Sequence, residues 1–193
     1  DMSGPATEFT PLAGNIMVAV NGFPAEGIER FDYFDAMNIA SKKAARYIGK
    51  LAAELSPTDI EVFEMDANVD NELPRVVYLF QIFSHGPYTD MLYYGDNFVH
   101  ALPIIIHPNE ILDGAVTNRD YLQLPNADPT FLYQNHPLLL ELYDRHGKDI
   151  NWVGTVMYNA PHEVDDKQRN AMKNAQLAKY HFDADIALLT KEG

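Results

Sequence analysis

Residues 104–131 form the chemically densest stretch of the chain, because an apolar run passes there into several ionisable side chains. Among them are His107, Glu110, Asp113 and Asp120. Imidazole and carboxylate groups exchange protons and bind divalent metals. A carboxylate enclosed in a pocket at a strand exit would have a raised pKa and could transfer protons near neutrality. We therefore expect these four residues to be catalytic, although Asp113, which precedes a glycine, could equally be structural.

Three histidines stand where predicted elements end or begin. His85 and His107 each follow an apolar run, and His136 precedes Pro137 at a predicted helix start. If the strand ends converge, the three imidazoles could bind zinc or another divalent ion. Their spacing is not a metal signature, however. The alternative is that they cap strands and pack against aromatic rings.

Polar residues in nearby segments are candidates for substrate binding, namely Tyr94, Asp96, Asn118 and Tyr121. Asp96 follows Gly95 and could be only a turn residue. The tyrosines are more often packing residues than acids, because a phenol has a pKa near ~10. Both interpretations remain open for this group.

Composition limits the classes of function. A chain of 193 residues that is 47% hydrophobic is long enough for one substantial core, so we expect a single domain. Its net charge of −14 disfavours nucleic acid and anionic membranes as partners. It contains no cysteine, which excludes disulfides, thiolate metal sites and a cysteine nucleophile. No phosphate-binding loop, dinucleotide motif or serine hydrolase motif occurs. We expect a cytoplasmic protein that acts on a small molecule.

The periodicity of apolar residues predicts alternating strands and helices. Apolar residues recur at helical spacing in residues 32–55, after His136 and in residues 164–182, so we expect three helices there. The continuous apolar run at residues 76–83 instead indicates a strand covered on both faces. Such alternation predicts an α/β fold with a parallel-rich sheet and helices on both faces. The other predicted strands are residues 15–20, 60–65, 101–106, 152–157 and 184–190.

Several short blocks together carry a resemblance to a known family. They are Asp1-Met2-Ser3-Gly4-Pro5, Thr10-Pro11, Leu112-Asp113-Gly114-Ala115, the block LYDRHGKD at residues 142–149, and residues 175–179. The chain resembles, over nearly its whole length, the component B proprotein of glycine, sarcosine and betaine reductases. LYDRHGKD is the most specific of these blocks.

The resemblance implies a hetero-oligomeric reductase that cleaves a C–N bond in a small nitrogen-containing substrate. It also implies a longer proprotein, processed into two subunits, with a pyruvoyl group made from a cysteine just after the equivalent of Asp113-Gly114-Ala115. Here the matching positions fall near Tyr121 and Pro125, and neither side chain can form a pyruvoyl group. A pyruvoyl cofactor is therefore not expected, and the resident cofactor is unknown.

Two functions remain open from the sequence. One is an enzyme subunit that uses histidine, carboxylate or metal-assisted chemistry in place of the pyruvoyl group. The other is a non-catalytic structural subunit that retains the family fold and assembles with a catalytic partner. Under both, we expect a partner subunit. The chain begins with Asp1 and ends directly after a predicted strand, so we expect it to be part of a longer or processed polypeptide.

Overall fold

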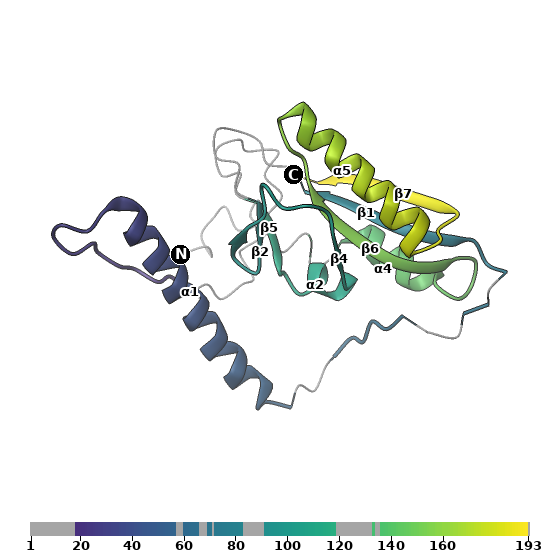
Figure 1. Ribbon diagram of the computed structural model, residues 1–193. Coiled ribbons are helices and arrows are strands. Elements are labelled where there is room, and N and C mark those ends of the chain that lie inside the picture. Colours follow the sequence, from purple (N-terminus) through teal and green to yellow (C-terminus); the bar gives the residue numbers. More distant parts are fainter. Residues whose placement is uncertain are drawn as a thin grey trace, which may run out of the picture. The chain divides into compact units, whose positions relative to one another are not determined.

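The computed structural model describes residues 18–56, 60–65, 69–70, 72–82, 91–118, 133 and 136–192. The chain divides into two compact units, Asp1–Val62 and Phe63–Gly193. The first unit contains one long helix, α1 (Arg30–Ala53), as its apolar spacing predicts. None of the side chains of α1 is buried. The second unit contains the sheets and the remaining helices (Figure 1).

A four-stranded sheet forms the centre of the second unit, with the strand order β4-β6-β1-β7. Strand β1 (Arg75–Ile82) lies parallel to both β6 (Asn151–Asn159) and β7 (Ile186–Glu192). The short strand β4 (Ile104–Ile106) adds to β6 in the antiparallel direction. The predicted parallel-rich sheet is therefore confirmed.

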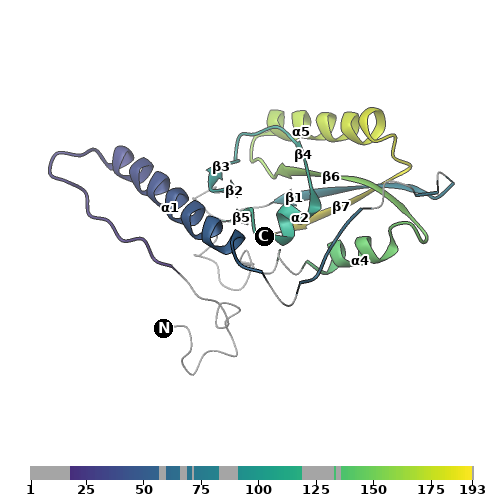
Figure 2. The ribbon, with the colours of Figure 1, turned by 90° about the horizontal axis from the view of Figure 1, so that it is seen from below.

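Helices cover both faces of this sheet, as Figure 2 shows for α5 and α4. Helix α4 (Pro137–Arg145) begins at Pro137, because proline suits the first helical position. Helix α5 (Val164–Gln176) continues into a π-helical turn, η2 (Leu177–His181). Side chains alternate in direction along β1, so one strand supplies the cores under both helices.

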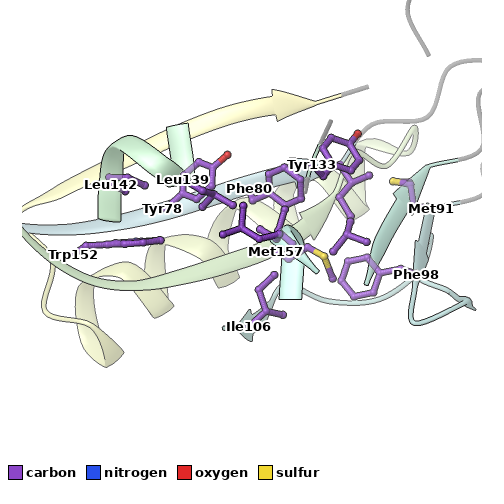
Figure 3. Close-up of a cluster of buried hydrophobic side chains, with 14 residues drawn as sticks. Tyr78, Phe80, Met91, Phe98, Ile106, Tyr133, Leu139, Leu142, Trp152 and Met157 are labelled. Atoms are coloured by element: carbon purple, nitrogen blue, oxygen red, sulfur yellow. The ribbon is translucent and has the colours of Figure 1, made fainter. Parts of the chain in front are cut away.

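The larger core lies between the sheet and α4. Tyr78 and Phe80 of β1 pack there with Trp152 of β6 and with Leu139 and Leu142 of α4, and all five are at most 4% exposed (Figure 3). The opposite core, beneath α5 and η2, consists of Val77, Leu79, Val156, Tyr158 and Phe182. Burial of these aromatic and branched side chains is the main stabilising contribution to the unit.

A small antiparallel sheet has the strand order β3-β2-β5. It consists of β2 (Met91–Tyr93), β3 (Asp96–Asn97) and β5 (Val116–Asn118). Between β4 and β5 lies a five-residue helix, α2 (Pro108–Leu112). The described part of the stretch that we expected to hold the chemistry, residues 104–118, therefore contains a strand, a short helix and a second short strand.

Three strand predictions need correction. Residues 18–20 of the predicted strand 15–20 lie outside any strand, and residues 15–17 are outside the described part of the chain. Residues 60–65 form no strand either, since Ile60 and Val62 are more than 60% exposed and gain no pairing partner. Of the predicted buried strand 101–106, only residues 104–106 form a strand, β4, and Ile105 within it is 45% exposed. Alternation of apolar residues alone does not supply the neighbouring strand that an extended segment requires.

Asn159, the last residue of β6, fixes the segment that leads into β4. Its amide is 1% exposed and donates to the backbone carbonyls of Phe98 (3.0 Å), Val99 and Ala101 (3.3 Å). Its Oδ1 accepts a hydrogen bond of 2.6 Å from Asn170 of α5. One buried amide thus connects the end of β6 to both neighbouring segments.

We expect Asn159→Ala to lower the free energy of unfolding by about 3 kcal/mol, because each buried polar group left without a partner costs roughly 1–3 kcal/mol. Urea denaturation measures the change. Gln168→Ala, at an exposed position of α5, is the matched control and should cost under about 0.5 kcal/mol. Equal effects of the two substitutions would contradict this role for Asn159.

Candidate functional site

The start of α2 is held by its own side chains. His107 is the N-cap residue, and its Nδ1 accepts a hydrogen bond of 3.2 Å from the backbone N–H of Asn109. In the reciprocal contact, Oε2 of Glu110 accepts a hydrogen bond of 2.8 Å from the backbone N–H of His107. This reciprocal arrangement is a capping box, with Pro108 at the first helical position. It fixes the position of the Glu110 carboxylate.

Two tyrosines converge on the other oxygen of that carboxylate. Tyr93 donates to Oε1 of Glu110 at 2.6 Å, and Tyr94 donates to the same atom at 2.9 Å. The two rings lie 4.8 Å apart. The small sheet supplies both phenols, so Glu110 connects α2 to this sheet.

These hydrogen bonds determine the charge of the Glu110 carboxylate. Burial alone would raise the pKa of Glu110, but the hydrogen bonds from Tyr93, from the His107 backbone and from Tyr94 together lower it. Burial raises the pKa of Tyr93 and of Tyr94, and the hydrogen bond to Glu110 raises both further. Near neutrality the site therefore holds a carboxylate and two protonated phenols. The lowered pKa favours the charged form of Glu110, and its predicted catalytic role stays a prediction.

Tyr94 occupies an unusual backbone conformation. Its φ is 50° and that of Gly95 is 77°, so both central residues of the turn between β2 and β3 have positive φ. Such two-residue hairpin turns favour Asn-Gly, and a bulky residue at the first position is strained. The Tyr94 side chain is 58% exposed. The turn thus holds a phenol at the surface beside Glu110, in a conformation that is unfavourable for tyrosine.

Asn109 and Tyr143 connect α2 to α4. Tyr143 of α4 donates a hydrogen bond to Oδ1 of Asn109, and the Asn109 amide donates to the carbonyl of Phe63 at 3.0 Å. Burial, and then the negative charge of Asp113, raise the pKa of Tyr143 to about 12. The same aspartate also contributes to the raised pKa of Tyr94. Asp113 therefore acts electrostatically on tyrosines from two different elements.

The predicted site residues separate into distinct groups. Tyr94, His107, Glu110 and Asp113 come together around α2, whereas Asp96 lies exposed in β3. Asp113 is the C-cap residue of α2 and is exposed, which suits the structural alternative, and its catalytic role stays a prediction. Asn118 pairs with Met91 through the β5 backbone, and its side chain lies outside the described residues. His85, Asp120 and Tyr121 also lie outside them.

His136 has a different environment. It is the N-cap residue of α4, is 6% exposed, and packs edge-on against the rings of Tyr78 and Phe80 at centroid distances of 6.3 and 6.0 Å. Among the described residues, no three histidine, aspartate or glutamate side chains are grouped so that they could hold a metal ion. Since His85 is outside this part of the chain, the three-histidine metal site stays a prediction.

Three residues of the site were missed as candidates from the sequence: Tyr93, Asn109 and Tyr143. The His-Pro-Asn-Glu pattern indicates a capping box between His107 and Glu110, but it gives no signal for the side-chain contacts of Asn109. Tyr143 belongs to the LYDRHGKD block, but nothing in that block indicates a contact with α2. Such a contact depends on the tertiary fold.

Comparison with known proteins places this chain in a family. The family model for glycine/sarcosine/betaine reductase component B subunits matches residues 1–193. The chain belongs to this component B family. This confirms the resemblance recognised in the sequence. No solved structure matches the chain.

Curated relatives agree with this assignment. The glycine reductase complex component B subunits alpha and beta of Acetoanaerobium sticklandii are 28% identical to the chain over 198 residues. The sarcosine and betaine reductase complex component B alpha subunits of Peptoclostridium acidaminophilum are each 32% identical, over 198 and 204 residues. The alignments cover the whole chain but only 46% of each relative. This component B chain thus spans about half the length of the relatives that it matches.

Two further observations bear on the site of this component B chain. The 193 residues contain no cysteine, the residue from which the resemblance implies that a pyruvoyl group is made. None of the helices in the described part of the chain has the length and apolar character needed to cross a membrane.

The strain at Tyr94 can be measured with two substitutions that both remove the phenol ring. We expect Tyr94→Asn to be more stable than Tyr94→Ala by about 1 kcal/mol, because asparagine tolerates positive φ better than alanine does. Denaturant unfolding measures the difference. The same pair of substitutions at Tyr93, which lies in extended β2, is the control and should show no advantage for asparagine. Equal stabilities at position 94 would remove the argument from strain.

Proposed function

We propose that this chain is a subunit of a reductase complex of the component B type, and that the site around Glu110 binds the positively charged nitrogen of a small substrate. Glycine, sarcosine and betaine, which the names of the relatives contain, each carry a cationic nitrogen near neutrality. The observation that supports the proposal best is the strained Tyr94, whose phenol is held against an ionised carboxylate.

The groups at this site suit a cation. The Glu110 carboxylate and the exposed Asp113 both supply negative charge near Tyr94. The paired rings of Tyr93 and Tyr94 offer aromatic faces, which attract quaternary and protonated amines. Because Glu110 accepts all three of its hydrogen bonds from fixed donors, it can keep its charge and position while the substrate enters.

The role of His107 follows from its capping contact. A neutral imidazole that accepts at Nδ1 carries its proton on Nε2. His107 is exposed at the start of α2, so this N–H is a donor available to a substrate oxygen. We propose that the chain binds and orients its substrate, and that bond cleavage takes place in the assembled complex.

We expect Glu110→Gln to weaken betaine binding by the purified complex about tenfold, which corresponds to roughly 1.4 kcal/mol. Isothermal titration calorimetry measures it. 3,3-Dimethylbutanoate, which has the shape of betaine without the cationic nitrogen, should bind weakly to both proteins. Glu163→Gln, at an exposed carboxylate before α5, is the control and should bind betaine normally.

The opposite pattern would contradict cation binding. If betaine and 3,3-dimethylbutanoate bound equally well, or if Glu110→Gln bound betaine normally, the site would not recognise the charged nitrogen.

A second candidate function is a structural subunit without a catalytic site. Both oxygens of Glu110 are already used to join α2 to the small sheet, and such a contact also suits a purely structural role. Under this alternative Glu110→Gln would disrupt assembly of the complex, and the subunits that did assemble would bind betaine with unchanged affinity. Size-exclusion chromatography alongside the titration separates the two functions.

A further inference from the structure

A second site lies on the sheet face that carries α5, away from α2. A cavity of about 420 Å³ opens there between α5 and the strands β1 and β7. We call it the α5 groove. Its floor includes Leu79, Tyr158, Ala187 and Leu189, and the side chains along its helical wall include Lys167 and Asn174. Its volume lies within the range of small-molecule sites in proteins, about 300–1,000 Å³.

The sequence of α5 explains why the groove is open. Lys167, Ala171, Asn174 and Ala178 follow one another at intervals of three or four residues, so they lie on one face of the helical segment. The two alanines have short side chains that leave room beside the helix, and Leu189 of β7 is 58% exposed. An apolar surface therefore remains accessible beside the helix.

Asn174 brings an unsatisfied polar atom to this groove. Its side chain is 5% exposed, and no described residue donates a hydrogen bond to its Oδ1. Asn170, one turn earlier on α5, is by contrast bonded to Asn159. A buried acceptor without a donor is unfavourable, so a ligand with an N–H group would gain by reaching Asn174.

Lys167 supplies an unpaired positive charge at the same groove. Among the described residues, no carboxylate forms an ion pair with it, although Arg169, two positions later, binds Asp166 at 3.1 Å. The whole chain carries twice as many acidic as basic residues. A free ammonium group in this setting, next to an apolar floor, suits a ligand that has a carboxylate and an apolar body.

We propose that the α5 groove binds a small carboxylate that carries an apolar side chain and an N–H donor. The carboxylate faces Lys167, the N–H faces Asn174, and the apolar group covers Leu79 and Leu189. This site shares no residue with the Glu110 site, so it does not depend on the proposed function.

N-acetyl-L-leucine has all three features and is the probe. Isothermal titration calorimetry with the purified protein should show saturable binding. N-acetyl-L-leucinamide, which lacks the negative charge, and N-acetylglycine, which lacks the apolar side chain, should each bind at least tenfold more weakly. Absence of saturable binding, or equal binding of the three compounds, would overturn the proposal and favour a protein segment as the occupant of the groove.

Two variants locate the binding. Lys167→Gln should remove the preference for the acid over the amide, and Ala175→Phe should abolish binding because the ring fills the groove. Lys173→Gln, also on α5 but outside the groove lining, is the control and should bind normally. If Ala175→Phe does not fold, the result for Lys167→Gln, at an exposed position, is sufficient to test the site. Unchanged preference in Lys167→Gln would contradict the site, whereas betaine binding should stay unchanged in this variant.

Discussion

The organisation of the candidate site depends on one ionised carboxylate, that of Glu110. It accepts hydrogen bonds from two phenols and from the backbone N–H of His107, and these contacts connect α2 to the small sheet. A five-residue helix is too short to be stable alone. The Glu110 carboxylate therefore connects α2 to the small sheet, and the Asn109–Tyr143 contact connects it to α4.

The four-stranded sheet positions the elements that contact α2. The buried side chains of β1 fix α4, and α4 presents Tyr143 to α2. Asn159, at the carboxyl end of β6, fixes the segment before β4, and β4 leads directly into His107. The two large cores thus set the position of a site that is itself only partly buried. The strain at Tyr94 is tolerated because the neighbouring contacts hold the turn in place.

Much of the fold was predictable from the sequence. The strand β1 and the start of α4 were predicted correctly. A strand buried on both faces needs a continuous apolar run, and the fixed φ of proline suits the first turn of a helix, so both signals can be seen in the local sequence. The prediction for residues 60–65 was wrong, because strand formation depends on a neighbour that the local pattern does not specify. His107, Glu110 and Tyr94 were named as candidates from the sequence, but the hydrogen bonds that bring them together depend on tertiary contacts. The Tyr143–Asn109 contact joins residues 34 positions apart, and no periodicity predicts it.

The pKa of Glu110 in the folded protein tests this account most directly. Carbon-detected NMR titration of its side chain should give a pKa below the ordinary value for glutamate of about 4.3, because three donors stabilise the charged form. A lowered folded-state pKa means that Glu110 stabilises the protein above its unfolded pKa and that this stabilisation is lost as the pH falls. In Tyr93→Phe the pKa should rise towards the ordinary value. A pKa above the ordinary value in the wild-type protein would show that burial dominates, and would contradict an ionised carboxylate at the centre of the site.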